Sequence, residues 1–266
     1  MGRLLYIEWL KLKNYRTFWI LGILYLISIF AVNYIGYRIQ EEVYREEATK
    51  GMAQMVLGPK PWSFPLVWHT AAWITSWLLY FPGLMMIILM SNEFTFKTHR
   101  QNIIDGWSRH QYIMVKFVYG ILAAVLSTVM MFLTALFFGF IHDSDFSTDN
   151  MHYILFFFVV AVTYTMAALL ISLFIKRGAL AIGLFFIYGL VIENLLAGLM
   201  NYYLKNAGRY LPLESADNLL MPFPFAEAAQ KQITQPYNHT LLFIFAIGYL
   251  LAYFYFSYKR WRTADL

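Results

Sequence analysis

Six long apolar runs with almost no charged residues are the feature that most constrains this chain. A helix that crosses a hydrocarbon core about 30 Å thick needs about 20 mostly apolar residues, because each residue adds about 1.5 Å. Trimmed of their polar ends, the runs predict membrane-spanning helices near 18–36, 66–91, 115–140, 152–175, 179–200 and 239–258. We therefore predict an all-α, polytopic integral membrane protein with one membrane domain over residues 1–266.

The composition excludes the soluble alternatives. Charged residues make up 13% of the chain and hydrophobic residues 60%, whereas a soluble domain is about 25% charged. So few charges cannot cover the surface of a soluble globule, and so apolar a chain does not stay disordered in water. The chain has no cysteine, which excludes disulfides and thiolate metal sites.

The distribution of basic residues predicts the orientation. Six spans place both termini on one side, and loops rich in Lys and Arg face the cytoplasm. Lys176 and Arg177 fill the short turn between the fourth and fifth spans, whereas the loop 142–150 has three Asp and no Lys or Arg. We predict that both termini are cytoplasmic in the cell (inner) membrane. The predicted external loops are 37–65, 141–151 and 201–238.

Two segments outside the spans have patterns of their own. A helical wheel over residues 3–16 separates polar from apolar side chains, which are Arg3, Glu8, Lys11 and Asn14 on one side and Leu5, Trp9 and Leu12 on the other. This pattern predicts an amphipathic elbow helix in the cytoplasmic interface of the membrane. Before the sixth span, residues 219–225 are apolar but too short and too rich in proline to cross the membrane. We predict a re-entrant-like segment there.

The cytoplasmic loop 92–112 is longer than a simple connection requires. Thr98 is a suitable N-cap for a short helix, and Gly106 is placed to end it. We expect an apolar knob ringed by polar side chains, with Ile103, Ile104 and Trp107 in the knob and Arg100, Gln101, Asn102, Asp105 and Arg109 around it. Such a surface is typical of protein docking. The alternative is an amphipathic loop that lies on lipid headgroups.

Candidate residues for a substrate path lie in the second and fifth spans. Glu193 is the one acidic residue well inside an apolar run, where a carboxylate is costly and has a functional or a pairing role. It either lines a path together with Asn194 or serves as a structural hydrogen-bond partner. In the second span, Trp73, Trp77 and Tyr80 either line a cavity or belong to the packing and the interfacial aromatic belt.

The chain lacks the motifs of nucleotide hydrolysis and of zinc catalysis. No Gly-Lys dipeptide occurs, so no G-x-x-x-x-G-K-[ST] phosphate loop is present, and no H-E-x-x-H motif occurs either. One group of side chains offers ligands for a divalent cation, namely His142, Asp143, Asp145, Asp149 and His152. An ordinary polar loop is the favoured interpretation of that group. We predict no catalytic residue, no metal site and no cofactor bound by this chain.

The loop residues and the overall layout resemble those of a known family. Glu93, Thr98, Arg100, Gly106, Ser108, Arg109 and Lys116 are similar to the pattern of the ABC-2 family of ABC transporter permeases, which has Glu, Thr, an apolar pair, Pro or Gly, Ser-Arg and a Lys that enters the third span. The elbow helix, the six spans and the re-entrant-like segment resemble that family over essentially the whole chain.

The resemblance implies a transport subunit rather than an enzyme. It implies two permease subunits, identical or different, with a path between them lined mainly by the second and fifth spans. It also implies a separate ATPase subunit that binds ATP and Mg, and an export direction. The coupling residues expected from it are Glu93, Thr98, Arg100, Ile103, Ile104, Asp105, Gly106, Trp107, Ser108 and Arg109. We expect membrane lipid around the bundle and no nucleic acid; the alternatives are a membrane-embedded enzyme acting on lipid or peptide, or a non-transporting anchor.

Overall fold

The computed structural model describes residues 2–45, 50–52, 60–142, 145–221 and 237–263. These ranges are largely helical and contain no strand. Five helices are long and apolar enough to cross a membrane, and the number is six when one bent pair counts as a single span. The prediction of an all-α polytopic membrane protein is confirmed.

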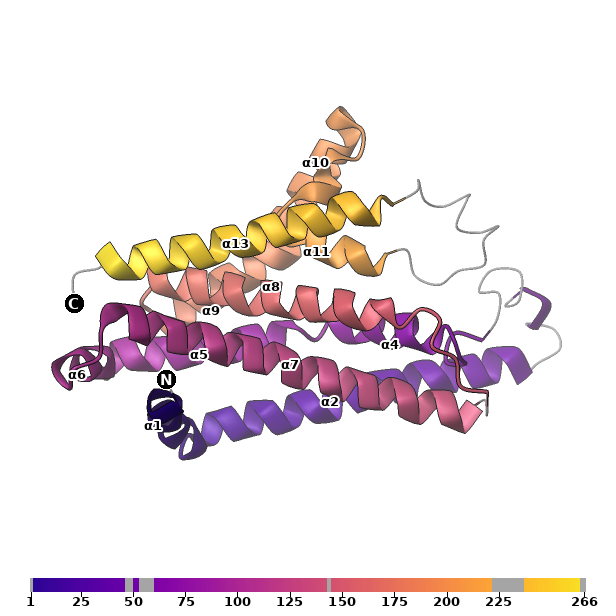
Figure 1. Cartoon of the computed structure of the whole chain (residues 1–266). Helices are drawn as coiled ribbons and strands as arrows, with labels where there is room; N and C mark the ends of the chain where they lie inside the picture. Colours follow the sequence, from indigo (N-terminus) through magenta and orange to yellow (C-terminus); the bar gives the residue numbers. More distant parts are fainter. Residues whose placement is uncertain (1, 46–49, 53–59, 143–144, 222–236, 264–266) are drawn as a thin grey trace.

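Figure 1 shows how the helices are arranged. In chain order they are α1 (Gly2–Lys13), α2 (Arg16–Arg45), α4 (Val67–Ser76), α5 (Tyr80–Thr95), α6 (Thr98–Ile104), α7 (Arg109–His142), α8 (His152–Phe174), α9 (Gly178–Ile187), the π-helix η1 (Tyr188–Ile192), α10 (Glu193–Leu204), the 3-10 helix η2 (Ala207–Tyr210), α11 (Glu214–Asp217), the 3-10 helix η3 (Asn218–Leu220) and α13 (His239–Thr263).

Helix α8 lies at the centre of the bundle. It contacts α4, α5, α7, α9 and α13, and most of its side chains are buried. Small residues on its neighbours permit this close packing, because a Cβ at Gly83 of α5 would come within 2.6 Å of Phe185 and 3.5 Å of Ala168. By contrast, α2 keeps most of its side chains on the outside of the bundle.

The second predicted span, 66–91, is not one continuous helix. It consists of α4 and α5, which meet at an angle of 41° across a turn at residues 77–79. The cause is Pro82, which has no N–H to give to the carbonyl of Leu78 and whose ring crowds that carbonyl. The break places the aromatic residues around Tyr80 at a bend in the middle of the bundle.

The fifth span is also irregular. Helix α9 passes into the π-helix η1 and then into α10, and Figure 1 shows α10 leaving the bundle. A π-turn inside an α-helix changes the direction of the helix and is often found at functional sites. Apolar side chains remain exposed along α10, among them Leu195, Leu199 and Tyr202.

The segment after α10 turns back into the bundle. The short helices η2, α11 and η3 pack against α10, α8 and α13. Tyr164, near the midpoint of α8, donates a hydrogen bond to Asp217 of α11 over 2.9 Å. The segment 207–220 therefore reaches the middle of the bundle. Most of the run for which a re-entrant-like segment is predicted, 219–225, lies outside the described part of the chain.

Helix α1 and the last residues of α13 lie at the end of the bundle that carries α6 (Figure 1). Helix α1 runs across the direction of α2, and α13 ends beside the start of α7, where Arg109 Nη1 donates to the carbonyl of Arg262 over 2.6 Å. An even number of spans requires this arrangement.

Candidate functional site

Two residues with left-handed backbone geometry form the ends of the loop that holds α6. Lys97 has φ 54° and precedes the helix, and Gly106 has φ 95° and follows it. Gly106 ends the helix as expected, because glycine adopts positive φ without steric cost. Thr98 is not the N-cap but the first helical residue, since the carbonyl of Lys97 already accepts from the N–H of Arg100 over 3.0 Å.

The exposed face of α6 differs from the predicted knob. Ile104 is 77% exposed, and Arg100, Asp105 and Ser108 are exposed beside it. Ile103 is half-buried, and Trp107 is buried in the core, with Lys11 Nζ 6.0 Å from the centre of one of its rings. The prediction that Trp107 belongs to an exposed knob is therefore wrong. Gly106 redirects the chain after α6, so helical spacing no longer relates Trp107 to Ile103.

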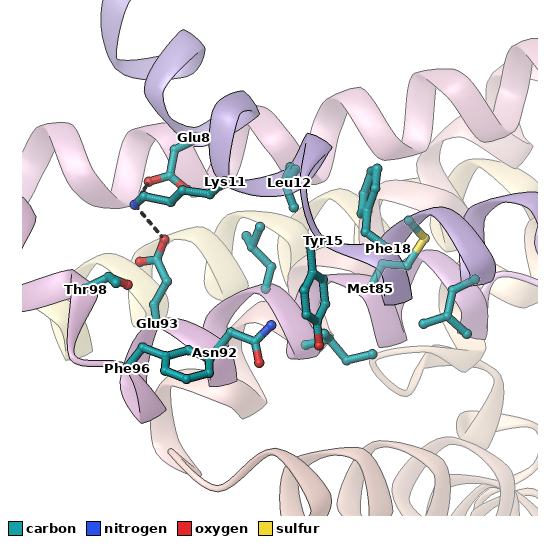
Figure 2. A pocket seen from close by; sticks show the side chains of 13 residues that line it. Glu8, Lys11, Leu12, Tyr15, Phe18, Met85, Asn92, Glu93, Phe96 and Thr98 are labelled. Carbon is teal, nitrogen blue, oxygen red and sulfur yellow. Dashed lines mark hydrogen bonds and ion pairs between the residues drawn. The ribbon is translucent and has the colours of Figure 1, made fainter.

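Four charged side chains from three helices form an ion cluster behind α6. Lys116 of α7 places its Nζ 2.6 Å from Glu8 Oε2 of α1 and 2.5 Å from Glu93 Oε1 of α5. Lys11 of α1 places its Nζ 2.7 Å from Glu8 Oε1 and 3.3 Å from Glu93 Oε1. Figure 2 shows Glu8 and Lys11 facing Glu93. Two carboxylates thus meet two ammonium groups, which offsets the cost of burying them.

Further polar contacts join the ion cluster to α6. The hydroxyl of Tyr112 donates to Glu93 Oε2, and Lys11 donates to Asn102 Oδ1 of α6 over 3.4 Å. The ring of His99 lies 2.8 Å from the backbone carbonyl of Glu93 through Nδ1. These contacts hold α6 against α1 and α5, which the ion cluster joins to α7.

The sequence predicts the two sides of α1 but not which side faces the protein. Glu8 is completely buried, whereas Tyr6 and Trp9 are 61% and 40% exposed. The polar side of the elbow helix thus faces the ion cluster, and aromatic side chains face outward. Beside the ion cluster, α1, α2 and α5 enclose a cavity of about 180 Å³ with mostly apolar walls (Figure 2).

A second cavity, of about 200 Å³, lies at the bend between α4 and α5. We call it the mid-bundle cavity. Four of the five residues proposed for a substrate path line it, namely Trp73, Trp77, Tyr80 and Asn194. Tyr80 fits there because Gly189 of the π-helix has no Cβ to collide with its hydroxyl.

Glu193 is not part of the lining. It is 1% exposed, and its Oε1 accepts hydrogen bonds from the N–H groups of Leu213 over 2.5 Å and of Glu214 over 3.1 Å. These donors begin α11 and would otherwise lack a helical partner. Of the two interpretations of Glu193, the contacts favour the structural hydrogen-bond partner.

Two acidic residues that the sequence reasoning missed line the mid-bundle cavity. Asp217 Oδ2 accepts from the hydroxyl of Tyr164, and Glu214 Oε2 accepts from Asn218 Nδ2 over 3.0 Å. Burial raises the pKa of Asp217 to about 8, and the charge of Glu214 adds to this effect while the hydrogen bond from Tyr164 opposes it. The sequence signal that could have identified these two residues is that they are acidic and lie next to the apolar stretch 219–225.

The described ranges contain no group of three or more His, Asp and Glu side chains placed to hold a metal ion. The sequence had offered the group around His142 and His152, of which Asp143 lies outside these ranges.

A family model described as ABC-2 family transporter protein matches residues 4–192 of the chain. The match covers more than half of the sequence and includes α1, α6, the whole ion cluster and the walls of the mid-bundle cavity from α4, α5 and α8. None of the curated proteins compared with the chain matches it.

Proposed function

Because the chain belongs to the ABC-2 family of transporter proteins, we propose that it is a permease subunit that exports its cargo when a separate ATPase subunit docks on α6. The observation that carries this proposal is the way in which α6 is attached to the rest of the bundle. The exposed side of α6 offers Arg100, Ile104 and Asp105 to a partner, and its buried side contacts α1 and α5, which the ion cluster joins to α7.

This mounting suits a coupling element. Asn102 and His99 are buried on the inner side of α6, where they contact Lys11 and the backbone of Glu93. A displacement of α6 by a partner is therefore passed to α1 and α5 rather than absorbed by a loose loop. Packed helices that move as rigid bodies are a usual means of switching access between two sides of a membrane protein.

The basic residues support a cytoplasmic location for this end of the bundle. Lys and Arg gather there, with Lys97, Arg100, Arg109, Lys176, Arg177, Lys259, Arg260 and Arg262 near the ends of α5, α6, α8 and α13. Such segments face the cytoplasm, where ATP is available. ATP and Mg are bound by the partner in this proposal, because the chain has no phosphate-binding loop.

A second permease subunit completes the proposed transporter. The apolar side chains of α2 and α10 are largely exposed in the single chain, and they face either lipid or a second subunit. In the proposed transporter, the second subunit covers part of this exposed apolar surface.

The docking step is tested by Ile104→Glu, which changes an exposed residue that packs against little of this chain. A charge at the centre of an apolar contact costs about 2 kcal/mol or more, which is about thirtyfold in affinity. We expect the ATPase to be lost when the variant is purified from membranes. Thr148→Glu, an exposed change in the loop between α7 and α8, is the matched control.

The double variant Ile104→Glu, Arg100→Glu decides the outcome. Normal recovery of the ATPase together with cargo-stimulated hydrolysis would show that α6 is not the coupling element. Normal recovery without any cargo-stimulated hydrolysis in the unmodified complex would instead favour a non-transporting anchor.

A further inference from the structure

The mid-bundle cavity lies at the second and fifth spans, the two that the proposed path uses. Its walls come from the bend between α4 and α5, from the middle of α8, from the π-helix and from α11. Each of these elements is irregular or sits at mid-length in its span. An engineered cavity of about 150 Å³ is large enough for benzene, so this one, at about 200 Å³, accepts a slightly larger organic group.

One side of the cavity is aromatic. Trp73 and Trp77 meet edge to face with ring centroids 6.1 Å apart, and Tyr80 and Tyr164 do so at 5.1 Å. Trp77 remains 63% exposed, so its ring is available to a ligand. The faces of such rings are electron-rich and attract cations, above all organic ammonium groups.

The lining of the cavity also contains acidic residues that have no basic partner in the described part of the chain. Glu214 and Asp217 line the cavity, and neither forms an ion pair with a Lys or Arg among the residues that the structure describes. A carboxylate at this depth is costly without a countercharge. A bound cation would supply that countercharge.

We infer that the mid-bundle cavity binds the ammonium group of an organic cation between Trp77 and Asp217. This inference rests on the proposed transport function, to which it adds the class of cargo. The aromatic wall distinguishes an organic cation from a metal ion, which requires oxygen ligands around most of its surface. Asn194, whose Nδ2 donates to the carbonyl of Gly189 over 2.9 Å, leaves its amide oxygen as a further acceptor at the cavity wall.

Asp217 also gives the site a dependence on pH. The titratable groups that face it are Tyr164 of α8, Tyr80 of α5, Glu193 of α10, Glu214 of α11 and Tyr253 of α13. None of these is a base that carries positive charge. Protons and the cation therefore compete for Asp217, whose raised pKa of about 8 predicts tighter binding as the pH rises from 6 to 9.

The test uses the full chain in lipid nanodiscs without any ATPase. Labelled phenyltrimethylammonium is the probe, empty nanodiscs measure its partition into lipid, and unlabelled tert-butylbenzene is the neutral competitor of the same shape. The variants are Asp217→Asn, Glu214→Gln and Trp77→Leu. Asp149→Asn, an exposed acid of another loop, and Trp19→Leu, a half-exposed tryptophan of α2, are the matched controls.

We expect saturable binding of the cation that tert-butylbenzene does not displace. Asp217→Asn should weaken it at least tenfold, and Trp77→Leu about two- to fivefold, in proportion to a cation–π contact. The two controls should bind as the unmodified chain does. Each variant is first shown to elute as a single species, and if Asp217→Asn does not, Glu214→Gln and Trp77→Leu take its place.

Two results would overturn the inference. One is equal affinity for the cation and for tert-butylbenzene, and the other is unchanged affinity in the double variant Glu214→Gln, Trp77→Leu. Because the assay contains no ATPase, such a failure leaves the docking proposal standing. Normal recovery of the ATPase in the Ile104→Glu, Arg100→Glu variant, which would contradict the docking proposal, would equally leave this binding result intact.

Discussion

The acidic residues of the ion cluster have charged partners, whereas those of the mid-bundle cavity do not. In the ion cluster, Glu8 and Glu93 meet Lys11 and Lys116 within 3.3 Å. In the mid-bundle cavity, Glu214 and Asp217 have neutral hydrogen-bond partners. A buried cluster of paired charges fixes helices relative to one another. Carboxyl groups that have no countercharge leave room for a bound cation. Within one bundle, the ion cluster is therefore a structural element, and the mid-bundle cavity is the proposed place for a ligand.

The comparison is tested most strongly at Lys116. Replacing it by Met leaves Glu8 and Glu93 buried with Lys11 as their one ion-pair partner among the described residues. Breaking a buried ion pair by removing one member costs about 3–5 kcal/mol, and we expect the free energy of unfolding to fall by that amount. Denaturant titration of the purified chain measures it.

Lys97→Met is the matched control for Lys116→Met, because Lys97 is exposed. Its effect should stay within about 0.5 kcal/mol. A loss below about 1 kcal/mol for Lys116→Met would show that the ion cluster contributes little to holding the helices together.

The substitution Asp217→Asn is expected to reduce the pH dependence of stability rather than to remove an ion pair. The folded chain holds a proton on Asp217 up to a pKa of about 8, whereas the unfolded chain releases it near pH 4. Raising the pH through this window therefore favours the unfolded state. We expect the unmodified chain to lose about 2–3 kcal/mol more stability than Asp217→Asn between pH 6 and pH 9.

Unfolding measured at pH 6 and pH 9 checks this difference, with Asp149→Asn as the control that retains the pH dependence of the unmodified chain. Equal pH dependence in Asp217→Asn and the unmodified chain would mean that Asp217 is ionised in the fold, and the contrast between the two regions would disappear.

The sequence predicts the spans well because each apolar run is by itself long enough to cross a membrane. Pro82 in the second span was visible, yet the resulting break between α4 and α5 depends on where the helix finds room to bend. Gly106 ended α6 as predicted, because positive φ is a local property of the backbone.

The contacts of the candidate sites could not be predicted in the same way. Lys116 pairs with Glu8 over 108 positions of sequence and with Glu93 over 23, and no local pattern encodes such distances. The same holds for Trp107, which is buried in the core and lies near Lys11 of α1, far from it in the sequence. Charged residues at the ends of neighbouring spans were the available signal, since the membrane requires them to find partners.

The smallest effect is expected at Lys11, the member of the ion cluster that also contacts α6. Its side chain is 32% exposed, so solvent screens its ion pairs, and Lys11→Met should cost about 1 kcal/mol or less. However, the variant removes the hydrogen bond to Asn102 and the ammonium group near Trp107. Backbone amides at the end of α6, such as those of Asp105 and Trp107, should exchange with deuterium faster, while those in the middle of α8 do not change. Lys13→Met, an exposed change on the same helix, should leave both rates as they are. Unchanged exchange in α6 would mean that α6 is held in place without α1, and that α1 serves only as an anchor at the membrane interface.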